Sequence, residues 1–401
     1  MKITEILATP VNLPLDAPYY WSHGELPGFT KTIIQVRSDE GLEGLGEAPG
    51  DGAAELITGT IAPRLLGCDA FDIQGCEALI VPPWRGLQST QDLGLIRAFG
   101  GIETALWDLR GKAWNQPLYQ LLGGAVRQSI PVTDYFAFRP RQGDAGGEET
   151  PEAVRDYCLA LKEEFGTTFF EGKFTTPDWR RSLRVVELLR EALGPEALLR
   201  VDSNQAYSVT DARQIAPELD ALGVRYWEDP VGSPEEMARL RESTSLPFST
   251  HNADIVKAQT LGVPNAIVGD PANQGGILRL QRFVGACEAL GIDFWCYSGD
   301  SGVQAAAYLH LCAATPWIRE PNQSLFRMMT NDVIEEGPFV PHNNALPVPQ
   351  GPGLGVTLSP DRLAHAHRLY LEQGTMNKYH DRGAPGRFRP LPYDPLAGLT
   401  G

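Results

Sequence analysis

Three segments of the chain each run from apolar residues into a group of oxygen-bearing side chains. They are Leu-Arg-Val-Asp-Ser-Asn-Gln (199–205), Val-Arg-Tyr-Trp-Glu-Asp-Pro (224–230) and Leu-Pro-Phe-Ser-Thr-His-Asn (246–252). Each pattern predicts a short buried strand with polar groups at its carboxyl end. The segments recur at roughly 25 residues, enough for one strand, one helix and two short loops. Parallel strands at that interval end at one mouth of a barrel, so we expect Asp202, Glu228 and Asn252 to meet around one ion.

The same alternation of short apolar runs and helical stretches continues through the chain from about residue 129. The strands that it predicts cover 130–136, 167–173, 198–202, 224–228, 246–250, 265–270 and 292–297. Helices between them include 178–192, 209–221 and 276–290. This βα repetition indicates an α/β fold in which helices cover parallel strands. An eighth strand has no clear pattern, and we look for it between 322 and 335.

The first part of the chain has a different pattern, with strands at 2–15 and 31–49, the latter turning at Ser38-Asp39-Glu40-Gly41, and helical periodicity over 52–124. We predict an N-terminal α+β capping domain at 1–128, a barrel domain at 129–340, and a C-terminal segment, 341–401, that returns to the capping domain. The aromatic stretch at 17–28 has Pro and Gly at both ends, which predicts a loop. It is either a packed surface loop or a lid that brings Tyr20, Trp21 or His23 to a substrate.

Composition and charge limit the classes of partner. The chain has 401 residues, which favours two domains, and a formal net charge of −16, which opposes binding to nucleic acid or to an anionic membrane surface. It has no basic leader and no run of about 18 apolar residues, so we expect a cytoplasmic protein. Its 6 cysteines form no CxxC pair, which favours reduced thiols over disulfides or zinc.

The oxygen donors at the three strand ends suit Mg²⁺ better than a softer metal. His251 competes with Asn252 for the third ligand position, because a softer metal would prefer the imidazole. Each of these residues could instead be a helix N-cap, a common use of Asp and Asn after a strand. Their recurrence at barrel-like intervals favours the metal site.

Two further charged residues stand at predicted strand ends. Lys173 closes the strand Phe169-Phe-Glu-Gly-Lys, one barrel unit before Asp202. Burial beside a divalent cation would lower the pKa of this lysine, as a base that removes a carbon-bound proton requires. A solvated lysine is the alternative. Asp270 ends the sixth strand, on the opposite side of the mouth, where a carboxylate can orient a partner on the next strand.

These motifs together resemble the enolase superfamily, in its mandelate racemase and muconate-lactonizing branch. The resemblance covers nearly the whole chain. It rests on Ile-Glu-Thr-Ala-Leu-Trp-Asp-Leu-Arg-Gly-Lys (102–112), the Val-Asp-Ser-Asn-Gln and Glu-Asp-Pro segments, Asp270 with the later Gly275-Gly276, and the Pro-Gly-Leu-Gly of 352–355. It implies a modified (β/α)7β TIM-type barrel with an N-terminal cap. It also implies a Mg²⁺ that stabilises an enediolate formed when a base removes the proton beside a carboxylate.

Segments such as Tyr135-Phe-Ala-Phe-Arg look most like the glucarate dehydratase group, which makes dehydration of a sugar acid the leading reaction. The chain departs from the family at the second strand, where Lys-x-Lys is replaced by Glu171-Gly-Lys173. An ungapped match to the glucarate group places Glu171 at the position of the base. The same match aligns that group's asparagine ligand with His251, whereas members that use glutamate align Asn252.

The largest departure is on the seventh strand, where the family places a histidine paired with the sixth-strand aspartate. Here the strand reads Gly291-Ile-Asp-Phe-Trp-Cys-Tyr, with Cys296 at the histidine position and Tyr297 next to it. Strand alternation lets one of the two face the mouth, and either a thiol or a phenol could protonate a leaving hydroxyl. Cys296 could equally be a packed core thiol.

We therefore expect a Mg²⁺-dependent lyase that acts on a small hydroxylated carboxylate, with Lys173 as base and Asp270, Cys296 and Tyr297 as further catalytic candidates. The substrate contacts would come from Tyr20, His23, Glu171 and Asn204. An epimerase, racemase or cycloisomerase would share the first step, and a non-catalytic barrel is the alternative from another class. Capped barrels of this kind often assemble, so we also expect a homo-oligomer.

Overall fold

Seven short parallel strands form the centre of the molecule. The structure is a computed structural model that describes residues 1–82, 93–297, 299–376, 380–381 and 384–388. The strands pair in the order β11-β10-β9-β8-β7-β6-β5. They are β5 (Asp134–Phe136), β6 (Phe169–Lys173), β7 (Leu198–Asp202), β8 (Tyr226–Glu228), β9 (Phe248–Thr250), β10 (Ala266–Gly269) and β11 (Asp293–Cys296). Each lies within a predicted strand, although β5 takes only the second half of 130–136.

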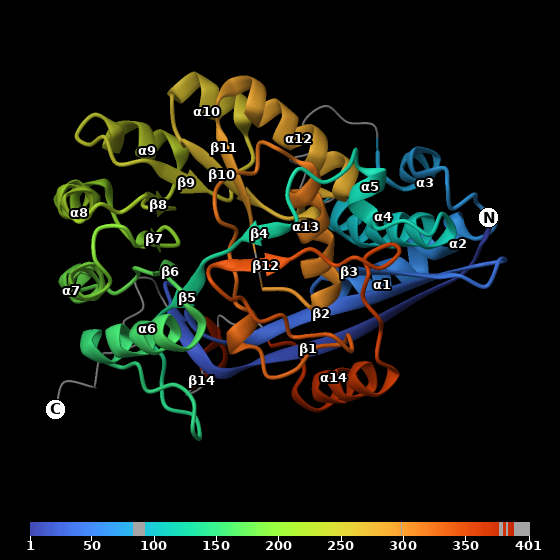
Figure 1. The fold of residues 1–401 in the computed structure, drawn as a ribbon, viewed down its shortest axis with the longest axis horizontal. Coiled ribbons are helices and arrows are strands. Elements are labelled where there is room, and N and C mark those ends of the chain that lie inside the picture. The colour runs from blue at the N-terminus through green and yellow to red at the C-terminus, as the bar shows by residue number, and fades with distance from the viewer. Residues whose placement is uncertain (83–92, 298, 377–379, 382–383, 389–401) are drawn as a thin grey trace.

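Helices connect these strands and lie outside them (Figure 1). They are α6 (Pro151–Phe165), α7 (Trp179–Leu193), α8 (Val209–Ala221), α9 (Pro234–Arg241), α10 (Ile255–Leu261), α11 (Pro271–Gln274), α12 (Ile277–Leu290) and α13 (Gly302–Ala314). In α7, for example, Leu183, Val186 and Leu189 recur at helical spacing and are buried. Asp178 caps its N-terminus. The predicted helices at 178–192, 209–221 and 276–290 are confirmed.

A two-residue segment closes the gap between the first and last strands of this sheet. Asn322 forms a parallel bridge with Val132, just before β5, and its side chain accepts the backbone N–H of Cys296. Gln323 donates its backbone N–H to the Cys296 carbonyl. The segment lies at the start of the range where we expected the eighth strand. It has no apolar run because it is only a short bridge.

The N-terminal part begins with an antiparallel sheet of β1 (Ile3–Trp21), β2 (Gly24–Ser38) and β3 (Glu43–Pro49). The prediction of a loop at 17–28 is wrong, because these residues continue β1 and β2 as a hairpin. A shift of register between Pro14 and Tyr19 accommodates the prolines that suggested a loop. The turn between β2 and β3 is confirmed, with Gly41 at a φ of +77°.

The remaining N-terminal elements are mainly helices that cover one face of this sheet. They are α1 (Gly52–Leu56), the π-helix η1 (Ile57–Ile61), α2 (Ala62–Leu65), α3 (Ile73–Ile80), α4 (Leu93–Ala113) and α5 (Leu118–Leu121). The helix α4 packs closely on β3, since a Cβ at Gly46 would lie 1.9 Å from the Gly101 carbonyl oxygen. Only glycine permits this approach of the two backbones.

Asp108 of α4 joins three separate parts of the chain. Its buried carboxylate accepts the backbone N–H groups of Leu45 in β3 and Leu354 in the Pro-Gly-Leu-Gly segment, at 2.8 and 2.7 Å. It also pairs with Lys112 at 2.7 Å. Two motifs far apart in sequence are therefore one structural unit.

The C-terminal part runs back along the N-terminal sheet. After the 3-10 helix η2 (Phe326–Met328), β12 (Ala345–Pro347) pairs with β4 (Ser129–Pro131). The helix α14 (Pro360–Gln373) then packs against β1, where Asn12 donates to the Gly374 carbonyl at 2.9 Å. A short pair, β13 (His380–Asp381) and β14 (Ala384–Phe388), follows. The rest of the predicted segment 341–401 lies outside the described residues. Among the described helices, none combines the length and apolar character needed to cross a membrane.

Candidate active site

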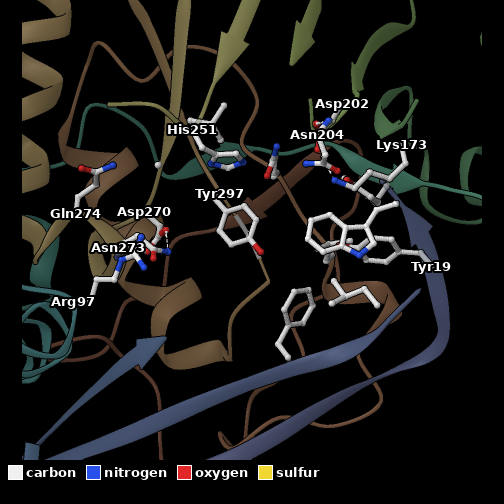
Figure 2. Close-up of a pocket in the computed structure, with 18 residues that line it drawn as sticks. Tyr19, Arg97, Lys173, Asp202, Asn204, His251, Asp270, Asn273, Gln274 and Tyr297 are labelled. Carbon is white, nitrogen blue, oxygen red and sulfur yellow. Dashed lines mark hydrogen bonds and ion pairs between the residues drawn. The ribbon is translucent and has the colours of Figure 1, made fainter. Parts of the chain in front are cut away.

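A cavity of about 400 Å³ opens at the carboxyl ends of the barrel strands (Figure 2). The N-terminal hairpin supplies one wall of it, and α4 supplies Arg97. Six of the residues predicted from the sequence line it, namely Lys173, Asp202, Asn204, His251, Asp270 and Tyr297. The structure therefore brings together side chains from five different parts of the chain at the predicted mouth.

Lys173 and Asp202 form a buried ion pair at the ends of the adjacent strands β6 and β7. The Lys173 Nζ lies 2.5 Å from Asp202 Oδ2, and the rings of Trp21 and Tyr135 are each 5.7 Å away. Burial lowers the pKa of Lys173, but the charge of Asp202 outweighs it, so the pKa lies above its usual value. The lowering expected beside a divalent cation is a different case, because the charge nearest to Lys173 here is the Asp202 carboxylate.

Three buried carboxylates meet beside this pair. Oxygens of Asp202, Glu228 and Asp229 all lie within 4.8 Å of one another. Burial, followed by the charge of Asp202, raises the pKa of Glu228 to about 8. Burial also raises the pKa of Asp229. Such crowding of acids costs free energy unless a cation neutralises it, and the donor set consists of the hard oxygens that suit Mg²⁺.

The structure separates the two candidates for the third ligand. His251 lines the cavity, and its Nε2 lies 2.9 Å from Glu228 Oε1. Desolvation of the ring lowers the pKa of His251, but the charge of Glu228 raises it more. Asn252 is exposed, and its side-chain oxygen accepts the backbone N–H of Asp254 at 3.1 Å. The expectation that Asn252 meets Asp202 and Glu228 is wrong, because this residue turns outward to support the start of α10.

Glu171 lies one layer below the cavity, inside the barrel, and does not line it. Its carboxylate pairs with Arg200 at 2.8 Å and accepts from Gln323 Nε2 at 2.5 Å. The same amide donates to Glu228 at 3.1 Å. The prediction of a substrate contact at Glu171 is wrong, because the side chain two positions later, Lys173, occupies the mouth.

The seventh strand presents the tyrosine rather than the cysteine. Cys296 is fully buried on the other face, with its Sγ 3.7 Å from that of Cys312. Tyr297 lines the cavity and stands edge-on to His251, with ring centroids 5.5 Å apart. Burial raises the pKa of Tyr297 well above its usual value, so the phenol keeps its proton at neutral pH. The catalytic assignment of Cys296 is therefore wrong.

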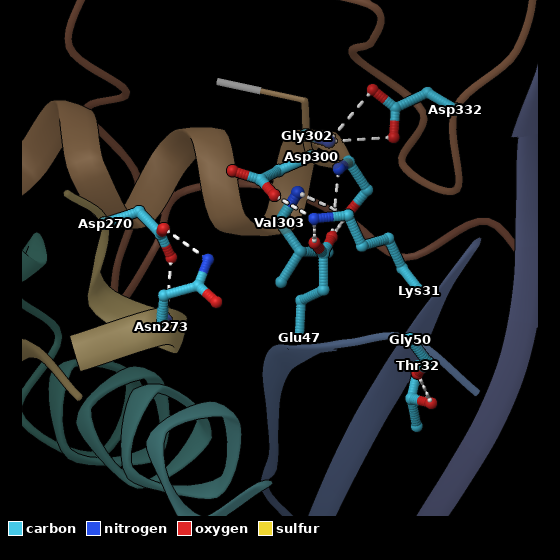
Figure 3. Close-up of polar contacts among 11 residues, drawn as sticks. Lys31, Thr32, Glu47, Gly50, Asp270, Asn273, Asp300, Gly302, Val303 and Asp332 are labelled. Atoms are coloured by element: carbon cyan, nitrogen blue, oxygen red, sulfur yellow. Dashed lines mark hydrogen bonds and ion pairs between the residues drawn. The ribbon is translucent and has the colours of Figure 1, made fainter. Parts of the chain in front are cut away.

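Asp270 lines the cavity and also caps α11. Its carboxylate accepts the backbone N–H of Asn273 at 2.9 Å and the Asn273 side-chain amide at 2.5 Å (Figure 3). Asp270 thus has the N-cap role that was the alternative for the other strand-end residues. Tyr297, directly after the neighbouring strand β11, also lines the cavity on this side of the mouth.

The hairpin reaches the barrel through its own backbone and side chains. Ser22 Oγ donates to the Asn204 carbonyl at 2.9 Å, which places the hairpin tip over β7. Tyr19 and Trp21 line the cavity, whereas Tyr20 is buried in the core behind them. The predicted substrate contact of Tyr20 is wrong, because alternate residues of a strand face opposite sides. His23 packs edge-on against Trp21 and does not line the cavity.

A second buried ionic cluster joins the N-terminal sheet to the barrel (Figure 3). Lys31 of β2 pairs with Asp300, and its Nζ lies 3.4 Å from Glu47 of β3. Glu47 in turn accepts the backbone N–H and the hydroxyl of Ser301, which caps α13. Burial raises the pKa of Glu47 to about 8. The cluster fixes one side of the mouth.

The residues that sequence reasoning missed include Arg97, Asp229 and Gln323. Asp229 follows Glu228 directly, so strand alternation would point it away. It has a φ of +40°, and this left-handed backbone ends the strand. Gln323 belongs to the short bridge that has no strand pattern. Arg97 lies on α4, and the sequence pattern of this helix identified only its apolar face.

Comparisons with known proteins agree with this architecture. Residues 3–123 match the family described as mandelate racemase / muconate lactonizing enzyme, N-terminal domain, and residues 152–362 match the enolase C-terminal domain-like family. The chain is 28% identical to a probable glucarate dehydratase of Streptomyces coelicolor, covering 96% of this chain and 95% of the relative. It is 31% identical to N-succinylamino acid racemase of Thermus thermophilus, covering 94% and 100%. Identity to a chloromuconate cycloisomerase of Pseudomonas putida is 29%, covering 92% and 100%.

Solved structures show the same likeness. An enolase of Thermobispora bispora complexed with magnesium and formate superposes with a TM-score of 0.85 at 28% identity, covering 94% of this chain and 95% of that one. An enolase of Pseudomonas fluorescens with bound magnesium, potassium and tartrate has a TM-score of 0.85 at 25% identity, covering 94% of each. The family matches span the N-terminal sheet and most of the barrel. The chain therefore belongs to the mandelate racemase and muconate-lactonizing branch of the enolase superfamily.

Proposed function

We propose that this protein removes the proton beside the carboxylate of a small hydroxylated acid, with Mg²⁺ as cofactor, and that it thereby dehydrates a sugar acid. The observation that carries the proposal is the position of Lys173 in the cavity, against the cluster of buried carboxylates. Relatives that include a probable glucarate dehydratase support the reaction class. The magnesium and small carboxylates in solved relatives support the cofactor and the kind of ligand.

Asp202 and Glu228 would hold the metal, with Asp229 or His251 completing the set. Their carboxylate oxygens are already gathered and buried, as a site for a hard cation requires. When bound there, Mg²⁺ would supply positive charge that neutralises Asp202 and stabilises the charge developing on the substrate carboxylate. Gln323 keeps Glu228 in place by donating a hydrogen bond to it.

Lys173 acts as the base in this proposal, because a cation held by Asp202 would offset the carboxylate charge that raises the pKa of the lysine. Its Nζ faces the cavity from the end of β6, between the carboxylates and the aromatic walls that exclude water. Tyr297 stands across the mouth with its proton retained and would donate it to the leaving hydroxyl group. Asp270 and Asn273 hold the turn beside Tyr297. The steps are then proton abstraction by an amine and protonation of the leaving group by a phenol.

Racemisation or cycloisomerisation is the second candidate, because both begin with the same abstraction. The racemase and cycloisomerase relatives favour it, with identities of 31% and 29%. A racemase needs a second base on the opposite face of the substrate. Tyr297 and Asp270 line that side of the cavity. Among the described lining residues, His251 is the one lysine or histidine that stands beside them.

The test is exchange of the α-proton in D₂O across a library of acid sugars, with and without Mg²⁺. We expect metal-dependent exchange with at least one acid, followed by loss of water to a keto acid. Lys173→Ala should reduce exchange by about 100-fold or more. Arg184→Ala, at an exposed ion pair on α7, is the matched control and should leave exchange unchanged. Exchange that survives Lys173→Ala would remove the base assignment, and a product that retains every hydroxyl would favour the second candidate.

A further inference from the structure

Arg97 is a cationic residue of the cavity wall that has no ionic partner among the described residues. It lies on α4 and lines the cavity together with Asn273 and Gln274 of α11 (Figure 2). Its Nε is buried without a hydrogen-bond acceptor, and no described carboxylate forms a salt bridge with it. A guanidinium that is partly removed from water and left unpaired costs free energy, which an anionic ligand group would offset.

The other cations near the mouth are already paired. Lys173 contacts Asp202, and Lys31 contacts Asp300. Neither has a free charge for a second anionic group. Lys173 and His251 contact Asp202 and Glu228, so Arg97 is the cation without a carboxylate partner among the described residues of the cavity lining.

The backbone holds Arg97 in place. One turn along α4, a Cβ at Gly100 would lie 2.8 Å from the backbone N of Gly276 and 3.0 Å from the Ala272 carbonyl oxygen. This close contact between α4 and the α11 region is possible because position 100 is glycine. Glu103 fastens the same helix by accepting the N–H of Ile277 at 2.7 Å. Arg97 is thus a preorganised group and not a free surface side chain.

Arg97 and Lys173 mark opposite sides of the mouth. Arg97 lies next to Asn273, just after β10, whereas Lys173 ends β6, and three strands separate β10 from β6 in the sheet order. Tyr297 lies between the two sides (Figure 2). A substrate whose reacting carboxylate lies at Asp202 would extend across the cavity and present its far end to Arg97.

We propose that Arg97 binds a second carboxylate at the far end of the substrate, so that the protein selects dicarboxylic sugar acids over monocarboxylic ones. The inference rests on the proposed function, because it names the substrate class of that reaction. A guanidinium donates two parallel hydrogen bonds to a carboxylate, and the Asn273 and Gln274 amides flank it. The chain's net charge of −16 repels a dianion, so a local cation is needed at each end.

The test compares six-carbon aldaric acids with the aldonic acids of the same configuration, which carry a hydroxymethyl group at the far end. We expect wild-type protein to favour the aldaric acid. Arg97→Gln should raise KM for the aldaric acid by about 10- to 100-fold, with a smaller change in kcat, and leave KM for the aldonic acid unchanged. Arg97→Lys keeps the charge but loses the paired hydrogen bonds, so it should restore part of the loss.

Arg64→Gln is the matched control, since it removes one exposed arginine of the same domain and should change neither KM. Exchange with aldonic acids alone, or an unchanged ratio of the two KM values in Arg97→Gln, would overturn the role of Arg97 and leave the proposed function intact. Absence of exchange with every acid would overturn the proposed function. In that case, thermal-shift titration with the aldaric acids tests the role of Arg97 by itself. Loss of the ligand-induced rise in Tm in Arg97→Gln supports this role, and an equal rise in wild-type protein and Arg97→Gln overturns it.

Discussion

At the scale of single residues, the adjacent pair Cys296 and Tyr297 provides the sharpest test of the chemistry. Tyr297→Phe removes only the phenol proton, so we expect α-proton exchange to persist while formation of the dehydrated product falls by about 100-fold or more. Cys296→Ser changes a thiol in the core on the other face and should leave the ratio of exchange to product unchanged. The measurement is deuterium uptake by NMR beside product formation on one substrate. Equal loss of both rates in Tyr297→Phe would exclude its role as the acid.

Substitutions of single residues also identify the third metal ligand. Mg²⁺ prefers carboxylate oxygen to imidazole, so we expect Asp229→Asn to weaken Mg²⁺ binding by about tenfold or more and His251→Asn to weaken it less. Isothermal titration with MgCl₂ measures both. Asn252→Ala is the control, because this side chain is exposed and turned toward Asp254. The reverse order of the first two variants would assign His251 as the ligand.

Where the sequence shows clearly at which residue a strand ends, the strand pattern predicts correctly which side chains reach the mouth. Lys173, Asp202 and Asp270 are final or directly following residues of regular strands, and all three line the cavity. Register decided the rest, because an error of one position moves a side chain to the other face. The pattern left Asn252 against His251 and Cys296 against Tyr297 open, and His251 and Tyr297 are the members of these pairs that line the cavity.

At the scale of elements, Glu103 joins the two main parts of the molecule. It lies on α4 but accepts the backbone N–H groups of Ile277 and Leu278, at 2.7 and 3.0 Å. These are the first N–H groups of α12, whose own N-cap, Gly276, has no side chain to offer. A Cβ at Gly276 would lie 2.6 Å from a Glu103 oxygen, so the glycine is needed for the contact.

This cap gives a pH dependence whose sign can be worked out. Burial raises the pKa of Glu103 from 4.5 to about 7, so the folded state binds this proton more tightly than the unfolded state. Its contribution is fully present below pH 4.5 and is lost as the pH rises to about 7, a change of at most on the order of 3 kcal/mol. We expect Glu103→Gln to remove this part of the pH dependence of the unfolding free energy, measured by urea unfolding between pH 4.5 and about 7. Parallel curves for the two proteins would contradict the assignment.

The elements that could be predicted are those with a long or regular pattern. The helices and most barrel strands follow from apolar spacing, and Gly41 indicated the turn between β2 and β3. The hairpin at 17–28 was missed because Pro and Gly suggest a loop, whereas the register shift after Pro14 tolerates them. The bridge at Asn322 and Gln323 is too short to have a period.

At the scale of the whole molecule, the cavity exists only because the two parts of the chain meet. The barrel supplies the carboxylates and Lys173, while the N-terminal part supplies Trp21 and Arg97. Ser22, Lys31 and Glu103 fix the contact at three separate places. A contact spread in this way leaves little freedom between the parts and allows a ligand at the mouth to stabilise the entire fold.

Removal of the metal should therefore lower the stability of the whole protein. Free Mg²⁺ at about 100 times its dissociation constant adds about 2.7 kcal/mol. For a chain of this length, this amounts to a rise in Tm of about 3 °C over protein in EDTA. Asp202→Asn should abolish the rise, because it removes a carboxylate of the cluster, whereas Glu187→Gln on the exposed face of α7 should retain it. Equal stabilisation of wild-type protein and Asp202→Asn would show that Mg²⁺ acts elsewhere on this acidic protein.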